Sequence, residues 1–193
     1  MISIPDAISI VKRNAKPLLK ETAKKVEKAG GYILFEDIFS PINMPPFRQS
    51  AMDGYALNLH DSLDYNLVGE VKAGDEHQPI LKKGEAVRIF TGAPVPDTAN
   101  AVMMQEKVKS DENTITIEHQ IALELNIRPL GEQVKTGDIA LKKGVKLTPA
   151  AIGYLISLGI TKVSVFKKPN IATVTTGNEL IQAGQNLSYG KIY

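Results

Sequence analysis

The chain has 193 residues, a formal net charge of +2 and 43% hydrophobic residues. It contains no cysteine, which excludes disulfides, thiolate nucleophiles and cysteine-ligated zinc. Its lysines are dispersed among acidic residues, so we expect no nucleic-acid-binding face. No apolar run approaches the roughly 20 residues of a membrane span. The composition therefore predicts a soluble cytoplasmic protein with a packed core.

Two helices are expected near the start of the chain. Ser3 is a plausible cap for a helix in "SIPDAISIVKRNA", and Pro17 is expected to end it. A second, shorter helix is predicted in "ETAKKVEKA", ending at Gly30. The first helix carries one apolar stripe at helical spacing, formed by Ile4, Ala7, Ile8, Val11 and Ala15.

The middle of the chain is rich in short β-type runs. "YILFEDIF" is expected to form a strand, and from about residue 66 to 132 five further runs follow, separated by Gly, Pro, Asp and Asn clusters. They are "NLVGEVKAG", "EAVRIFTG", "AVMMQEKV", "TITIE" and "IALELNI". This spacing predicts a compact barrel-like or sandwich module.

After this module the chain returns to an α/β pattern. Thr148 is expected to cap a helix that ends at Gly159, and "ITKVSVF" is expected to follow as a strand. The run "IATVTT" is typical of a buried parallel strand. Ligands of open α/β sheets bind beyond the carboxyl ends of strands. Glu179 lies in the loop that follows this run, so it is a candidate ligand-binding residue. The alternative is that Glu179 caps a following helix.

The stretch "PPFRQSAMDGYAL", residues 45–57, brings a hydroxyl and a carboxylate close together in sequence. Ser50 and Asp53 are candidate site residues. Asp53-Gly54 is also a common hairpin signal, because Gly tolerates positive φ and Asp bonds its own backbone. Taken alone, the turn interpretation is favoured.

The stretch "RIFTGAPVPDTANAVMMQE", residues 88–106, ends a β run at a threonine and a glycine. Thr91 is either an ordinary turn residue or a rigidly held hydroxyl. Gly92 lacks a side chain, so a ligand could approach the backbone there. Glu106 is expected to be a solvated residue at the rim.

These stretches, together with "IRPLGEQVKTGD" and "TTGNELIQAGQNLSYGKIY", resemble the molybdopterin molybdenumtransferases, the bacterial MoeA and gephyrin E-domain family. The resemblance covers essentially the whole chain, in order. "SAMDGYA" and "TGAPVP" in one chain at this separation are highly specific. The family inserts molybdate into molybdopterin to complete the molybdenum cofactor.

The resemblance implies a site that acts on adenylated molybdopterin, molybdate and Mg²⁺. On this model Asp53, Thr91 and Glu179 are catalytic, and Ser50 and Gly92 bind substrate. Bare carboxylates repel anionic substrates, so Asp53 and Glu179 make sense if they hold Mg²⁺ or orient water. Thr91 could donate to a phosphate or molybdate oxygen.

The resemblance also implies an α+β, multi-domain, elongated fold that forms homodimers. The N-terminal helix would pack on the truncated α/β domain that begins at residue 169. Its residues Ile4, Ile8 and Val11 would lie against a strand at 171–175. The inserted β-module would carry both motifs. The implied domains are the helix at 1–18, a discontinuous α/β linker or dimerisation domain at 19–43 and 134–168, the β-module at 44–133, and the start of a molybdopterin-binding domain at 169–193.

Two departures from the family pattern bear on activity. Gln133 stands where the family usually has an acid, and a neutral amide cannot replace a carboxylate as a general base. The sequence ends at Tyr193, just inside the implied molybdopterin-binding domain. We therefore expect an N-terminal portion of the enzyme that is inactive alone. One alternative is a non-catalytic binding or scaffold module of the same family. A second is an unrelated phosphate-binding hydrolase, and the two motifs argue against this second alternative.

Overall fold

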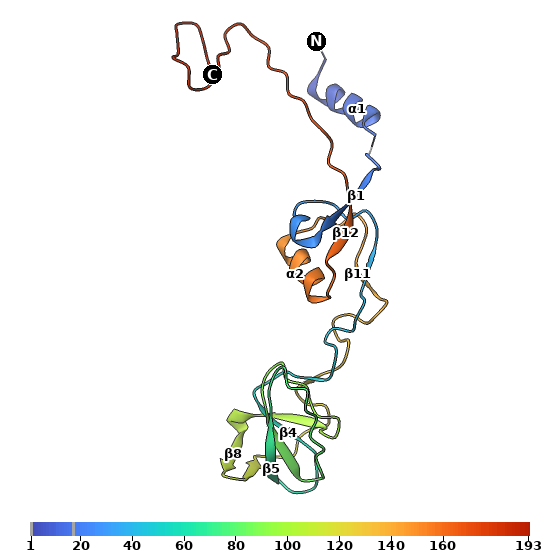
Figure 1. Ribbon diagram of the computed structural model, residues 1–193, viewed down its shortest axis with the longest axis vertical. Coiled ribbons are helices and arrows are strands. Elements are labelled where there is room, and N and C mark those ends of the chain that lie inside the picture. The colour runs from blue at the N-terminus through green and yellow to red at the C-terminus, as the bar shows by residue number, and fades with distance from the viewer. Residues whose placement is uncertain (1, 17) are drawn as a thin grey trace. The chain divides into compact units, whose positions relative to one another are not determined.

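The structure is a computed structural model that describes residues 2–16 and 18–193 (Figure 1). The chain divides into two compact units, Thr22–Val165 and a second one formed by Met1–Glu21 with Phe166–Tyr193. Most regular structure is β-sheet, and the described residues form two α-helices. Neither helix is long and apolar enough to cross a membrane.

A six-stranded curled sheet is the largest element of the first unit, where the sequence predicts a barrel-like module (Figure 1). The strand order is β7-β4-β6-β5-β9-β8, and every neighbouring pair is antiparallel except β5 with β6. The strands are β4 (Gly54–Leu57), β5 (Asp64–Val71), β6 (Glu85–Ile89), β7 (Ala101–Met104), β8 (Val108–Asp111) and β9 (Thr114–Ile117).

Each face of this sheet carries an apolar cluster, because alternate residues of a strand point to opposite sides. Tyr55 and Leu57 of β4 belong to one apolar cluster, and Ala56 between them belongs to the other. Val87 and Ile89 of β6 pack with Ala56. The first cluster also holds Tyr65, Ala86, Met103, Ile115 and Ile117, and the second also holds Val71, Leu81, Ala93, Val95, Ala99, Val102 and Ile127.

A smaller α/β core in the same unit forms around α2 (Pro149–Ser157). The Thr148 hydroxyl accepts a hydrogen bond from the Ala151 N–H at 3.2 Å, and Gly159 adopts φ +77°, so the predicted cap and stop of this helix are confirmed. The predicted strand is confirmed as β12 (Lys162–Phe166). The buried residues of this core are Val26, Ala29, Leu34, Leu147, Leu155, Val163 and Val165.

The helix predicted in residues 21–29 is wrong. Residues Glu21–Lys25 form strand β1, which pairs with β12, and only Val26–Lys28 form a short 3-10 helix, η1. In β1 exposed and half-buried residues alternate, as expected for a strand with one solvated face. Helix propensity is a weak preference in a segment this short, and pairing with β12 outweighs it.

Two short antiparallel pairs complete the first unit. Strand β2 (Ile38–Phe39) pairs with β11 (Ile139–Leu141), and β3 (Gln49–Ser50) pairs with β10 (Ile127–Arg128). The predicted strand in "YILFEDIF" is therefore confirmed only at its end.

The strand predicted in "IALELNI" is confirmed only at its last residue, Ile127. Glu124 and Asn126 adopt positive φ, which an extended strand does not allow. The Val102 N–H instead donates to the Leu125 carbonyl, and the Asn126 side-chain amide donates to the Val102 carbonyl. This loop therefore covers the outer edge of β7.

In the second unit the predicted N-terminal helix is confirmed as α1 (Ile4–Asn14). The Ser3 hydroxyl accepts the Asp6 N–H at 3.3 Å, as a capping residue does. The apolar stripe is exposed, with Ile4 77% and Val11 65% accessible. Pro17, predicted to end the helix, lies outside the described residues.

The strand predicted in "IATVTT" is wrong. Residues 167–177 have no regular secondary structure, and Ile171 and Val174 are 84% and 81% exposed. A parallel strand needs neighbours for its backbone hydrogen bonds, and no strand of the described residues pairs with this segment. The predicted contact of the α1 stripe with a strand at 171–175 is not confirmed, because residues 171–175 are all exposed.

Candidate functional site

Three strand ends bring the two sequence motifs together at one edge of the curled sheet. Gly54, the first residue of β4, lies opposite Ile89 at the end of β6 and opposite Met104 at the end of β7. Because both pairings are antiparallel, the residue before β4 meets the residues that follow β6 and β7. These neighbours are Asp53, Thr91 and Gln105.

Asp53 and Thr91 are joined by two hydrogen bonds. The Asp53 Oδ1 atom accepts the Thr91 backbone N–H at 2.7 Å and the Thr91 hydroxyl at 2.8 Å. The Asp53 carbonyl accepts the Gln105 N–H at 3.0 Å. Asp53 is exposed, and no hydrogen bond from the described residues reaches its other carboxylate oxygen. The carboxylate is therefore held in place and open to solvent.

Gly54 does not form the predicted hairpin turn. It is the first residue of β4, and its φ is not in the left-handed region. A Cβ atom at this position would lie 1.9 Å from the Met103 carbonyl oxygen. Glycine is needed here because two backbones approach closely, and Asp53 is thereby placed next to the end of β7.

The pKa of Asp53 is lowered from its ordinary value of 3.8. The main cause is the Thr91 backbone N–H, followed by the Thr91 hydroxyl, and the positive charge of Arg88 acts in the same direction. These donors and this charge favour the ionised form. Because the folded pKa is depressed, the bonds stabilise the fold above the unfolded pKa of about 3.9 and are lost as pH falls through the folded pKa.

We expect Thr91→Val to raise the pKa of Asp53 part of the way back to its ordinary value. The substitution removes the hydroxyl donor and keeps the backbone N–H, which has the larger effect on this pKa. A pH titration of the Asp53 carboxyl ¹³C shift measures the change. Thr116→Val is the matched control, because the Thr116 hydroxyl donates to Asp64 Oδ1 at 2.6 Å elsewhere in the sheet. If the pKa of Asp53 were unchanged in Thr91→Val, the Thr91 hydroxyl would not be a cause of the lowered pKa.

Arg88 and Gln105 belong to this edge, and the sequence reasoning missed both. The Arg88 guanidinium lies 5.0 Å from the centre of the Tyr55 ring and 5.2 Å from that of Phe90. It donates a hydrogen bond to the side-chain oxygen of Gln105. The available signal was an arginine inside the otherwise apolar run "AVRIF", where a cation needs a specific partner.

Ser50 and Gly92 connect the two motifs through the backbone. Ser50 is fully buried, and its hydroxyl donates to the Met52 carbonyl at 2.7 Å. The Gly92 N–H donates to the Ser50 carbonyl at 2.9 Å, and Gly92 adopts φ +88°, which requires glycine. This geometry shows a supporting role for both residues and gives no support to the prediction that they bind substrate.

Glu179 lies in the other compact unit, so its pairing with Asp53 stays a prediction. The residue is exposed and sits in a turn, and its carbonyl accepts the Ile192 N–H at 2.8 Å. A Cβ atom on Gly177 would lie 2.5 Å from Glu179 Oε1. No helix follows among the described residues, so the alternative that Glu179 caps a helix is wrong.

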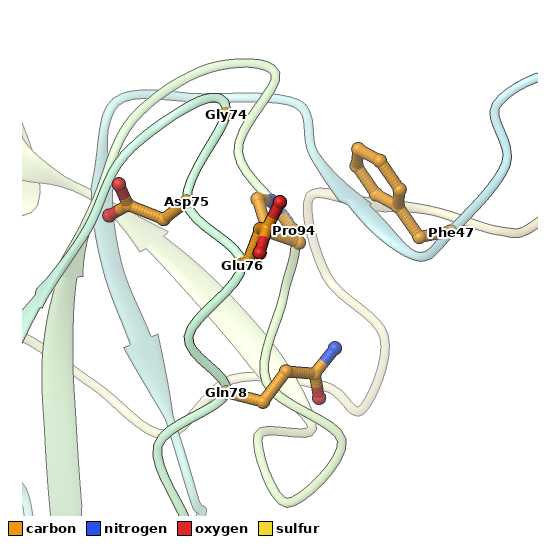
Figure 2. A pocket seen from close by; sticks show the side chains of 6 residues that line it. All are labelled: Phe47, Gly74, Asp75, Glu76, Gln78 and Pro94. Carbon is orange, nitrogen blue, oxygen red and sulfur yellow. The ribbon is translucent and has the colours of Figure 1, made fainter.

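A separate pocket of about 310 Å³ lies beside the proline-containing segment after Gly92. In Figure 2 Phe47 and Pro94 contribute apolar lining, and the Asp75 side chain lies on the far side from Phe47. Asp75 already accepts the Lys72 N–H at 2.7 Å. The acidic side chains of this pocket do not suit an anionic substrate. Its lining residues are Phe47, Gly74, Asp75, Glu76, Gln78 and Pro94.

Residues 2–159 match the family model of the MoeA N-terminal region, domains I and II. The chain belongs to this family. The matched residues include the two motifs that the sheet brings together at Asp53 and Thr91. The resemblance stated from the sequence is thereby confirmed.

Curated relatives and solved structures agree with this assignment. The chain is 42% identical over 172 residues to the molybdopterin molybdenumtransferase of Haemophilus influenzae, covering 87% of this chain and 43% of the relative. It is 34% identical over 200 residues to that of Staphylococcus epidermidis, covering 99% and 47%.

Two crystal structures of the molybdopterin biosynthesis MoeA protein from Pyrococcus horikoshii resemble the chain. One has a TM-score of 0.84 at 31% identity and covers 98% of this chain and 52% of that one. The other has a TM-score of 0.74 at 34% identity and covers 100% and 51%. The chain therefore spans about half the length of the relatives that it matches.

The fit of Mg²⁺ to this MoeA-type edge depends on Asp53. Within the described residues no group of three or more His, Cys, Asp or Glu side chains could hold a metal ion. Magnesium usually keeps several waters and takes one or two carboxylates together with substrate phosphates. An exposed, ionised Asp53 with one oxygen not hydrogen-bonded fits such a water-rich site as a single ligand.

Proposed function

We propose that this chain is the N-terminal portion of a molybdopterin molybdenumtransferase and takes part in the insertion of molybdate into adenylated molybdopterin. The observation that carries the proposal is the family match over residues 2–159, which contains both motifs of the Asp53–Thr91 pair. The curated relatives are named as molybdenumtransferases. The scaffold alternative is not favoured, because nothing in those names supports it.

The finer domain organisation belongs to the same proposal. The β-module at 44–133 carries the Asp53 edge, and the α/β residues at 19–43 and 134–168 form the linker or dimerisation domain. Residues 169–193 begin the molybdopterin-binding domain, and the N-terminal segment that contains α1 packs on this domain. The homodimer and the cytoplasmic location stay predictions from the sequence.

In this proposal Asp53 is the catalytic group of the β-module, and Thr91 positions it. Both donors of Thr91 are directed to Asp53 Oδ1, so the Thr91 hydroxyl is not free to donate to an oxyanion. Mg²⁺ bound by Asp53 would neutralise charge on the anionic substrates, and Glu179 stays a candidate ligand from the sequence. Asp53 itself stays ionised at neutral pH and orients water or a metal-bound group.

Complementation tests the proposed function. A bacterial strain that lacks its molybdopterin molybdenumtransferase receives this chain, or this chain extended by the C-terminal half of the Haemophilus influenzae relative. Nitrate reductase activity reports molybdenum cofactor. We expect the extended protein to restore activity and the 193-residue chain alone to restore none. An inactive but folded extended protein would contradict the proposal.

The effect of Gln133 is tested in the same extended protein. Gln133 is exposed, and its N–H donates to the Met44 carbonyl at 2.9 Å, a bond that does not depend on the side chain. Gln133→Glu and Gln133→Asp are therefore expected to leave the fold intact. We expect cofactor synthesis to be unchanged or increased. A large loss with either substitution would show that a neutral side chain is required.

A further inference from the structure

Two arginines of the β-module differ in how their charge is satisfied. Arg48 donates to the Glu124 carboxylate at 3.1 Å and to the Ala99 carbonyl at 3.0 Å. Arg88 is half-buried, and within residues 2–16 and 18–193 no carboxylate lies within 4.0 Å of its guanidinium. Its hydrogen-bond partner is the neutral amide of Gln105. Arg88 therefore forms no close ion pair among these residues, although its charge acts on Asp53 at longer range.

The Arg88 side chain is held in one place near the sheet edge that carries Asp53. Tyr55 lies opposite Arg88 in the pairing of β4 with β6. Asp53 and Phe90 lie just outside β4 and β6 at this edge of the sheet, and the positive charge of Arg88 acts on the Asp53 carboxylate. Contacts with the Tyr55 and Phe90 rings and the bond to Gln105 fix the guanidinium. A fixed planar donor loses little entropy when it binds an anion.

An open depression beside Arg88 gives a ligand access to the guanidinium. Its volume is about 580 Å³, and β5 supplies much of its wall. Glu70 in this wall is paired with Lys72 at 2.6 Å, which reduces its repulsion of an anion. The lining residues are Tyr55, Leu67, Val68, Gly69, Glu70, Arg88 and Asn113.

We infer that Arg88 binds a tetrahedral oxyanion at this edge of the sheet, next to the Asp53–Thr91 pair. An arginine fork matches the geometry of phosphate-like oxyanions through two N–H groups. Asp53 alone would repel an anionic substrate, and Arg88 supplies a positive charge that acts at the same edge of the sheet. This inference rests on the proposed function for the identity of the substrate, which offers molybdate and a phosphate group as two sources of the same chemistry.

Titration of the chain with separate anions tests the inference and distinguishes the sources. Sodium molybdate, AMP and sodium chloride are added at matched ionic strength, and ¹⁵N NMR follows the Arg88 side-chain Nε–H and the Gln105 amides. We expect saturable shifts with molybdate, with AMP or with both, and none with chloride. Molybdate alone identifies the metal oxyanion, and AMP alone identifies a phosphate group. No saturable shift with either anion would overturn the inference.

Substitutions separate the charge of Arg88 from general electrostatics. We expect Arg88→Gln to weaken binding about tenfold or more, the loss typical of one charge-assisted hydrogen bond. Lys109→Gln changes the net charge equally but lies on β8 beside another depression, so binding should be unchanged. Equal effects of the two substitutions would overturn the inference.

The substitution Gln105→Glu keeps the Arg88 side chain but pairs its positive charge with a new carboxylate. The new carboxylate would take the place of the neutral amide that accepts from the guanidinium. We expect anion binding to fall by about tenfold or more, as in Arg88→Gln. This variant also decides the outcome if Arg88→Gln fails to fold, because full anion binding by Gln105→Glu would contradict the role of Arg88.

The failure of this inference differs from the failure of the proposed function. Anion binding is measured on the 193-residue chain without turnover, whereas complementation is measured on the extended protein. Complementation without Arg88-dependent anion binding would reject Arg88 as the anion site and leave the enzyme function standing. Anion binding without complementation would support Arg88 as the anion site and contradict the proposed enzyme function.

Discussion

Gly54→Ala is expected to destabilise the β-module by at least about 3 kcal/mol, at the upper end of the cost of overpacking. The new Cβ atom would lie 1.9 Å from the Met103 carbonyl oxygen and 2.8 Å from its carbonyl carbon. These are backbone atoms of β7, so no side chain can rotate to make room. The strands would have to separate at the edge that holds Asp53.

Thermal unfolding measures this effect, and two other glycines provide controls. A loss of about 3 kcal/mol corresponds to a fall in Tm of about 6–12 °C for a chain of this size. In Gly69→Ala the new Cβ would lie 4.0 Å from Val87 Cγ1, an ordinary contact, so little change is expected. Gly153→Ala in α2 meets nothing within 4 Å and should stabilise the helix by about 0.5–1 kcal/mol. A Tm for Gly54→Ala equal to that of Gly69→Ala would show that the strands can separate at little cost.

The parts of the fold that the sequence predicts well are those that short-range interactions determine. The capping hydroxyls of Ser3 and Thr148 bond backbone groups three residues away, and Gly159 ends α2 through its own backbone conformation. Each of these signals lies within one helical turn of its effect. The alternating β runs likewise carry their period in the local sequence.

The errors lie where a distant partner decides the structure. Residues 21–25 contain good helix formers, yet they pair with β12, which comes far later in the chain. Residues 171–176 are strongly β-branched, yet they have no partner strand among the described residues and form no strand. Local composition cannot report the presence or absence of a neighbouring strand.

The sequence predicted the residues of the candidate site but not the hydrogen bonds between them. Both motifs single out Asp53 and Thr91, whose catalytic role stays a prediction. Their hydrogen bonds depend on the register between β4 and β6, which the sequence does not state. For the same reason Arg88 and Gln105 were missed: the register places Arg88 opposite Tyr55, and it places Gln105, which follows β7, beside Asp53. The Asp53-Gly54 turn signal was misleading because a close backbone approach also requires glycine.

Asp53→Asn separates a catalytic carboxylate from a structural one. An asparagine carbonyl oxygen can accept the same two hydrogen bonds from Thr91, and Asn supports similar local turns. Because Asp53 is exposed, we expect the Tm of the extended protein to change by no more than about 2 °C. The fold and the Thr91 contacts should therefore survive while the negative charge is removed.

Cofactor synthesis by the extended Asp53→Asn protein is expected to fall on the order of 10²-fold or more, the usual cost of losing one electrostatic contact in the transition state. Asp64→Asn is the matched control, because Asp64 Oδ1 accepts the Thr116 hydroxyl at 2.6 Å in an equivalent exposed aspartate–threonine pair. We expect that control to retain full synthesis. Equal activity of the two variants would show that Asp53 only shapes the loop before β4. A selective loss in Asp53→Asn would assign the charge itself to the reaction, since the hydrogen bonds to Thr91 are common to both forms.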